Sequence, residues 1–116
     1  MPAIRRINTG QRMSDVVIHN GVAYLAGKVS GKGIAGTGPQ TRDVLATIER
    51  LLAEAGSSKD RILRAEIFLA DISDFAEMNK EWDDWVPPGA TPARATVQTK
   101  LANPDYRVEI VVTAAV

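Results

Sequence analysis

The sequence of 116 residues contains no cysteine and one histidine, His19. Without cysteine there can be no disulfide framework, no thiol nucleophile and no thiolate metal site. A single histidine also excludes a metal site built from several imidazoles. Any chemistry that this chain performs must therefore rest on carboxylates, hydroxyls, amides and cationic side chains.

Neither sign of charge is in excess, and no long apolar run is present. Fourteen Lys and Arg residues balance fourteen Asp and Glu residues, so the formal net charge is zero. Binding to nucleic acid needs a strongly basic surface, so this class of protein is not expected.

No stretch has the roughly 18 apolar residues of a membrane-spanning helix, and the N-terminal segment lacks the apolar core of a signal peptide. We expect one cytoplasmic domain over residues 1–116.

Two segments have apolar residues at helical spacing. Residues 39–55 carry one apolar stripe, and Gly56 is a typical helix end. Residues 73–86 carry a second stripe that includes Trp82. At the start of this second helix, Asp74 and Glu77 have the spacing of a capping box.

Strands fill most of the remaining sequence. They are predicted over residues 3–7, 61–71, 94–101 and 106–116, and two more lie within residues 14–30 on either side of Asn20-Gly21, a strong hairpin signal. This order predicts an α+β fold with two helices packed on one face of a mixed sheet. Since no third helix exists to cover the other face, oligomerisation through that face is the economical expectation.

The glycines of residues 31–36 match the G-x-G-x-x-G pattern of dinucleotide-binding proteins. In such proteins the last glycine opens a helix, and a parallel strand ending in an acidic residue follows. Here Thr37, Gly38 and Pro39 still precede the helical pattern, and the strand before the loop belongs to a hairpin. A flexible loop is therefore the favoured interpretation.

Two charged residues near the C-terminus are candidates for chemistry. Arg94 opens a strand, and its planar fork of donors matches a carboxylate. Glu109 lies among aliphatic residues, where partial burial would suit it to carry a proton. Taken alone, each residue is better explained as a structural residue of the sheet, and only the pair together favours a functional site. If the last two strands pair antiparallel with Lys100 opposite Arg107, Arg94 and Glu109 share one face; a shift of one residue would separate them.

Three segments, DFAEMNKEWDDWV (residues 74–86), PARATVQTKL (residues 92–101) and YRVEI (residues 106–110), occur in this order in the sequence. Together they make the chain resemble the RidA/YjgF (L-PSP, reactive intermediate deaminase) family, and its YoaB-like branch most of all. The resemblance implies a chorismate-mutase-like fold assembled as a homotrimer, with active sites in the clefts between subunits. It also implies hydrolysis of reactive 2-imino acids, or their enamine tautomers, to 2-keto acids and ammonia, without a metal or another cofactor.

The resemblance further implies roles for individual residues. Arg94 would bind the carboxylate of the substrate with help from the backbone N–H of Thr96, and Glu109 would position and activate water. Asn79 corresponds to an asparagine near the pocket, and Gly27 to a glycine in a strand that lines it.

The chain also departs from the better-known deaminases. Met13 and Ala26 stand where those proteins have a tyrosine and a serine, and Thr96 replaces a cysteine found in some of them. The substrate therefore stays open, and so does a second function, the binding of 2-keto acids without turnover. Some relatives are named ribonucleases or translation inhibitors, a class that the zero net charge and the single histidine disfavour.

Overall fold

The computed structural model describes residues 3–116, so the first two residues of the predicted domain lie outside the described residues. In chain order the elements are β1 (Arg5–Thr9), β2 (Ser14–His19), β3 (Val22–Leu25), β4 (Lys28–Val29), α1 (Thr37–Glu54), β5 (Ile62–Leu69), α2 (Phe75–Trp85), β6 (Ala93–Gln98) and β7 (Val108–Ala115). Short 3₁₀ helices at Lys59–Arg61 and Ile72–Asp74 precede β5 and α2. Both predicted helices are confirmed to within two residues at each end.

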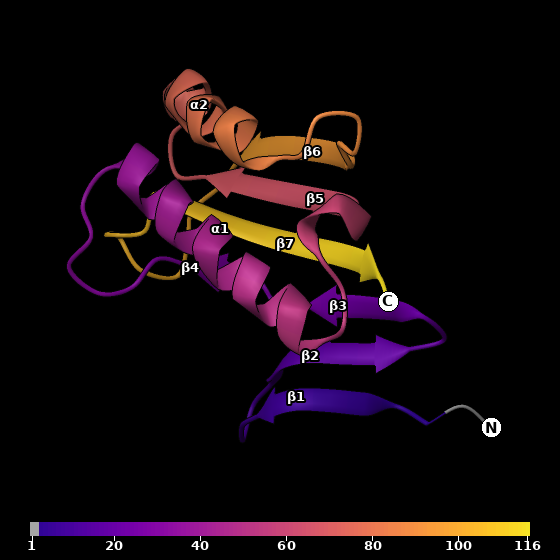
Figure 1. Ribbon diagram of the computed structural model, residues 1–116. Coiled ribbons are helices and arrows are strands. Elements are labelled where there is room, and N and C mark those ends of the chain that lie inside the picture. Colours follow the sequence, from indigo (N-terminus) through magenta and orange to yellow (C-terminus); the bar gives the residue numbers. More distant parts are fainter. Residues whose placement is uncertain (1–2) are drawn as a thin grey trace.

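The strands form one mixed sheet with the order β1-β2-β3-β7-β5-β6, and β4 also pairs with β7 (Figure 1). Only β5 and β6 run parallel; the other neighbours are antiparallel. The parallel pair is joined by α2, because parallel neighbours need a crossover connection rather than a tight turn. The predicted α+β fold with a mixed sheet is confirmed.

The turn between β2 and β3 shows why this hairpin could be predicted from two residues. Asn20 and Gly21 have φ values of 51° and 77°, so both central residues occupy the left-handed region. Asparagine and glycine tolerate this conformation best, and its twist matches that of the two flanking strands. His19 and Val22 then pair directly across the hairpin.

Both helices lie on the same side of the sheet (Figure 1), and the core lies between the two layers. Every second residue of β7 faces this core and is fully buried: Val108, Ile110, Val112 and Ala114. On the other face, which we call the open face, no helix among residues 3–116 covers the sheet. Tyr24 and Val97 are 51% and 48% exposed there. This arrangement agrees with the expected uncovered face.

The capping box predicted at the start of α2 is wrong, because its two carboxylates bind the start of α1 instead. Gly36 precedes the helix with φ 94° and offers no side-chain cap. Carboxylates from the start of α2 serve instead: Asp74 accepts a hydrogen bond from Thr37 Oγ1 at 2.8 Å, and Glu77 accepts one from the backbone N–H of Gly38. Asp74 makes no side-chain cap to its own helix. The free N–H groups and positive dipole end of α1 attract both carboxylates across the helix pair.

The predicted pairing of the last two strands is wrong, because β5 lies between β6 and β7. The crossover through α2 places β6 along one edge of β5. Residues 99–107 then pass the end of β5, so that β7 lies along its other edge. Backbone hydrogen bonds from Thr99 to Leu69 and from Ala70 to Arg107, both 3.0 Å, fix the two flanks at this point. Each edge of β5 is thereby paired, which a hairpin of β6 with β7 would not achieve.

Candidate functional site

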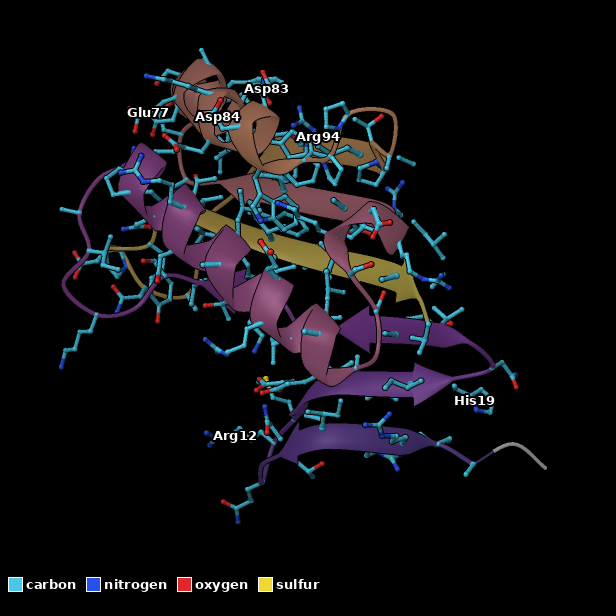
Figure 2. The ribbon with its side chains drawn as sticks, in the orientation of Figure 1. Arg12, His19, Glu77, Asp83, Asp84 and Arg94 are labelled. Atoms are coloured by element: carbon cyan, nitrogen blue, oxygen red, sulfur yellow. The ribbon has the colours of Figure 1, made fainter. Side chains whose placement is uncertain are left out.

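Arg94 lies on β6 and points under α2. Its backbone pairs with Ala65, a fully buried residue of the core face. The guanidinium carbon lies 5.4 Å from the ring centroid of Trp82 and 5.7 Å from that of Phe75, both in α2. Figure 2 shows Arg94 between α2 and β6, at the edge of the sheet. Cation–π contacts of this kind fix the plane of a guanidinium and leave its donor edge free.

No acidic group pairs with Arg94 in the described part of the chain. Arg42, Arg64 and Arg107 form ion pairs with Glu81, Glu66 and Asp74, respectively. Arg94 forms neither an ion pair nor a side-chain hydrogen bond within residues 3–116. Burial lowers its pKa from the usual value, and the negative charge of nearby Asp83 opposes this shift. Arginine nevertheless remains protonated at neutral pH, so a half-buried positive charge stands without a direct ion-pair partner among residues 3–116.

Glu109 lies on β7 and faces the opposite side of the sheet from Arg94. It pairs with Phe68 of β5, whereas Arg94 pairs with Ala65 of the same strand. These two positions on β5 are an odd number of residues apart, so their side chains point to opposite faces. The prediction that Arg94 and Glu109 share one face of a single chain is therefore wrong, since it depended on direct pairing of β6 with β7.

Gly27 and Glu109 do come together. Gly27 lies between β3 and β4, and the next residue but one, Val29, pairs with Glu109. A Cβ added at Gly27 would overlap Glu109 Oε2 and lie 3.0 Å from Glu109 Cδ. The carboxylate thus rests against the bare backbone of this glycine, an approach that a side chain would prevent.

Asn79 and Thr96 both lie near Arg94. Asn79 is in α2 between Phe75 and Trp82, and Thr96 follows Arg94 by two residues on the same face of β6. Asn79 Oδ1 and Thr96 Oγ1 are buried and have no hydrogen-bond partner. The structure therefore gathers Arg94, Asn79 and Thr96 on one face of the sheet and Gly27 with Glu109 on the other.

Two residues that contact Arg94, Phe75 and Trp82, were not predicted from the sequence as part of the site. Phe75 and Trp82 were part of an apolar stripe, and nothing in that stripe distinguished ring contacts to an arginine from ordinary core packing. Their places four residues before and three residues after Asn79 put all three on one side of α2. That spacing is the signal that could have found them.

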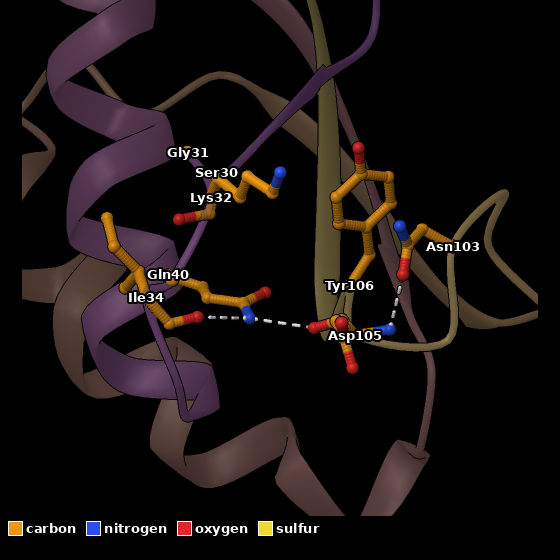
Figure 3. Close-up of a pocket in the computed structure, with 9 residues that line it drawn as sticks. Ser30, Gly31, Lys32, Ile34, Gln40, Asn103, Asp105 and Tyr106 are labelled. Carbon is orange, nitrogen blue, oxygen red and sulfur yellow. Dashed lines mark hydrogen bonds between the residues drawn. The ribbon is translucent and has the colours of Figure 1, made fainter.

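The glycine-rich loop lines a separate pocket of about 280 Å³ together with Asn103, Asp105 and Tyr106 (Figure 3). Gln40 closes its floor, because its Nε2 donates 2.9 Å hydrogen bonds to the carbonyl groups of Ile34 and Asp105. The strand before the loop, β4, runs antiparallel to β7. A dinucleotide-binding unit would need a parallel strand pair here, so the interpretation as a loop holds. Neither Arg94 nor Glu109 lines this pocket.

Comparison with known proteins identifies the family. The family model described as endoribonuclease L-PSP matches residues 3–116. The RutC family protein YoaB of Escherichia coli K12 is 51% identical over 113 residues, which cover 97% of this chain and 98% of that protein. The chain belongs to the RidA/YjgF (L-PSP) family.

Solved structures of RidA/YjgF relatives have the same fold. A member of the YjgF protein family from Neisseria meningitidis is 50% identical with a TM-score of 0.94, covering 97% of this chain and 94% of that one. A putative translation initiation inhibitor from Salmonella typhimurium is 49% identical with a TM-score of 0.90, covering 98% of each chain. The names of these relatives do not specify one reaction.

Two positions that depart from the better-known RidA deaminases differ in exposure. Met13, between β1 and β2, is 63% exposed, whereas Ala26, beside Gly27, is half-buried.

Among residues 3–116, no helix is long and apolar enough to cross a membrane. The same residues contain no group of three or more His, Asp or Glu side chains suited to hold a metal ion.

Proposed function

We propose that this protein hydrolyses reactive 2-imino acids, or their enamine tautomers, to 2-keto acids and ammonia. The observation that carries the proposal is the Arg94 guanidinium, which is held against two aromatic rings without an acidic partner. A half-buried cation with a free planar donor edge suits a small carboxylate, which it can bind through two parallel hydrogen bonds.

The site is built between protomers. Arg94 lies at the outer strand of the sheet, and Glu109 lies on the open face, so one chain cannot bring them to the same ligand. When the open face of one protomer receives the β6 edge of its neighbour, Glu109 of the first stands near Arg94 of the second. The same contact covers Tyr24 and Val97, which are exposed in the single chain. A homotrimer, closed by heterologous contacts around a threefold axis, satisfies this requirement.

In this site Arg94 binds the carboxylate of the substrate, and Glu109 transfers a proton from the attacking water to the leaving nitrogen. Glu109 accepts a proton from water as the oxygen bonds to C2 of the protonated imine, giving a carbinolamine. Glu109 returns the proton to the nitrogen, and the C–N bond then breaks as the carbonyl forms. The hydroxyl proton passes to the departing ammonia, so the 2-keto acid and ammonium leave. The protonated imine carbon is already electrophilic, so orientation of the water and proton transfer supply most of what is needed. Gly27 keeps the Glu109 carboxylate in place.

Turnover is tested by generating a 2-imino acid or 2-aminoacrylate in situ and following its decay with and without the protein. The wild type should accelerate the decay. Arg94→Lys keeps the charge and loses the two-pronged contact, so kcat/KM should fall by about 10- to 100-fold. Arg42→Lys, on the exposed surface of α1, is the matched control and should behave as the wild type. No acceleration over a range of side chains would refute the proposal.

Binding of 2-keto acids without turnover is the second candidate, favoured by the departures at Met13 and Ala26. Both functions use Arg94 as the carboxylate anchor, so only turnover separates them. Calorimetry that detects binding of a keto acid, together with no acceleration of imine decay, would select the binding function.

A further inference from the structure

Gln40, in the first turn of α1, is buried and makes three hydrogen bonds to the backbone of two loops. It is 2% exposed. Its Nε2 donates to the carbonyl groups of Ile34 and Asp105, both at 2.9 Å (Figure 3), and its Oε1 accepts from the backbone N–H of Arg107 at 2.8 Å. A glutamine amide offers two N–H donors and a carbonyl acceptor at one point. These three backbone groups use both donors and the acceptor.

The two loops flank the strand pair that carries Glu109. Residues 30–36 follow β4, whose Val29 pairs with Glu109. Residues 99–107 end where β7 begins, two residues before Glu109. Within the part of the chain that the structure describes, Gln40 is the one residue whose side chain hydrogen-bonds to the backbone of both loops. Gln40 therefore joins the exit of β4 and the entry of β7 to the same turn of α1.

The placement of β4 beside β7 decides how the Glu109 carboxylate is held. Gly27 directly precedes β4, and its bare backbone is the surface against which this carboxylate rests. β4 has only two residues, Lys28 and Val29, which is fewer than an ordinary strand uses to fix its position by pairing. Contacts outside the strand must therefore hold Gly27 in place, and those of Gln40 reach both strands.

We propose that Gln40 is a positioning residue for the Glu109 carboxylate. It acts through the backbone of the two loops, which hold β4 and β7 in the alignment that places Gly27 against Glu109. The inference rests on the proposed function, in which Glu109 transfers the proton. Arg94 lies on β6 at the edge of the sheet, with β5 between β6 and β7. Loss of the Gln40 contacts should thus lower kcat and leave the binding of a 2-keto acid unchanged.

Two substitutions test this role. Gln40→Met keeps most of the volume and removes all three hydrogen bonds, whereas Gln40→Glu keeps the acceptor but, when ionised, cannot donate to the two carbonyl groups. With a 2-imino acid generated in situ at neutral pH, each variant should lose about tenfold in kcat, with KM changed by less than about twofold. Protonation of the new carboxyl group restores one donor, so the rate of Gln40→Glu relative to the wild type should rise as the pH falls.

Thr41→Val is the matched control for these substitutions. Thr41 is fully buried in the same part of α1, but its hydroxyl donates to the carbonyl group of Thr37 in its own helix, at 2.7 Å. Neither loop depends on that hydrogen bond. Thr41→Val should therefore keep the kcat of the wild type, whatever its effect on the thermal midpoint.

The outcomes separate the positioning role from a purely structural one. A wild-type kcat in both Gln40 variants would overturn the role, even if their thermal midpoints fell. A parallel loss of kcat and of 2-keto acid binding, measured by calorimetry, would indicate a general loss of structure and would overturn it too. Failure of both variants to fold would assign Gln40 to folding, with the same consequence. No turnover by the wild type would instead overturn the proposed function, and this inference with it.

Discussion

Replacement of Gly27 by alanine tests how the Glu109 carboxylate is held. The added Cβ would overlap Glu109 Oε2 and lie 3.0 and 3.3 Å from Cδ and Cγ of the same side chain. Ordinary contacts between such atoms are about 3.5 to 4 Å, so the carboxylate must move by about 1 Å. Gly27 does not have a positive φ, so alanine causes no backbone strain there.

The expected effect falls on activity rather than on folding. The end of a flexible glutamate side chain can shift at little cost, so the free energy of unfolding should change by less than about 1 kcal/mol. A misplacement of about 1 Å at a reacting group can cost about 100-fold in rate, equivalent to about 2.7 kcal/mol of transition-state stabilisation. The decay of a 2-imino acid generated in situ measures the rate, and urea denaturation measures the stability.

Gly31→Ala is the control for this substitution. A Cβ at Gly31 would make an ordinary contact of 3.6 Å with Asp43 Oδ2, and neither activity nor stability should change much. If Gly27→Ala kept the full rate, the Gly27 contact would have no part in positioning the carboxylate. If Gly27→Ala unfolded the protein, the Glu109 side chain would not be free to shift at little cost.

Two further predictions concern stability. Asp74 links the start of α1 to the residue just before β7, because it accepts hydrogen bonds from Thr37 Oγ1 at 2.8 Å and from Arg107 Nη2 at 2.6 Å. Asp74→Asn should lower the free energy of unfolding in urea by about 1 kcal/mol after allowance for partial exposure. An unchanged midpoint would contradict this link. The hydrogen bond from Lys28 holds the pKa of the Asp15 carboxyl below its ordinary value of 3.8. Since a lowered pKa stabilises the ionised folded state, the stabilising effect is complete above the ordinary pKa and is lost as the pH falls through the lowered one. Asp15→Asn should therefore unfold more easily at pH 7, and its difference from the wild type, measured by thermal denaturation, should disappear on acidification; a difference that grows instead would reverse the sign.

Local signals in the sequence were sufficient for most elements. Asn20-Gly21 specifies its turn through the φ values that the two residues tolerate, and the apolar periodicity of residues 39–55 marks α1 because a helix must bury one face. Alternation in β7 likewise separates its buried residues from Glu109. Each of these features depends on residues that are close in the chain.

The features that could not be predicted depend on contacts between distant segments. Whether β6 neighbours β5 or β7 is decided by the α2 crossover and by the path of residues 99–107, and neither leaves a periodic signal. The face of Arg94 follows from that neighbour, so the error in pairing became an error in the site. Asp74 and Glu77 have the spacing of a local cap, but the uncapped start of α1 competes for them and prevails.

Mixed oligomers test the central claim, that Arg94 of one protomer works with Glu109 of another. Arg94→Ala and Glu109→Gln, each inactive alone, are co-expressed in equal amounts and purified together. With random assembly, each site has an even chance of an intact Arg94 and an even chance of an intact Glu109, so activity should recover to about one quarter of the wild-type value per site. No recovery above that of the separate variants would contradict a site shared between protomers.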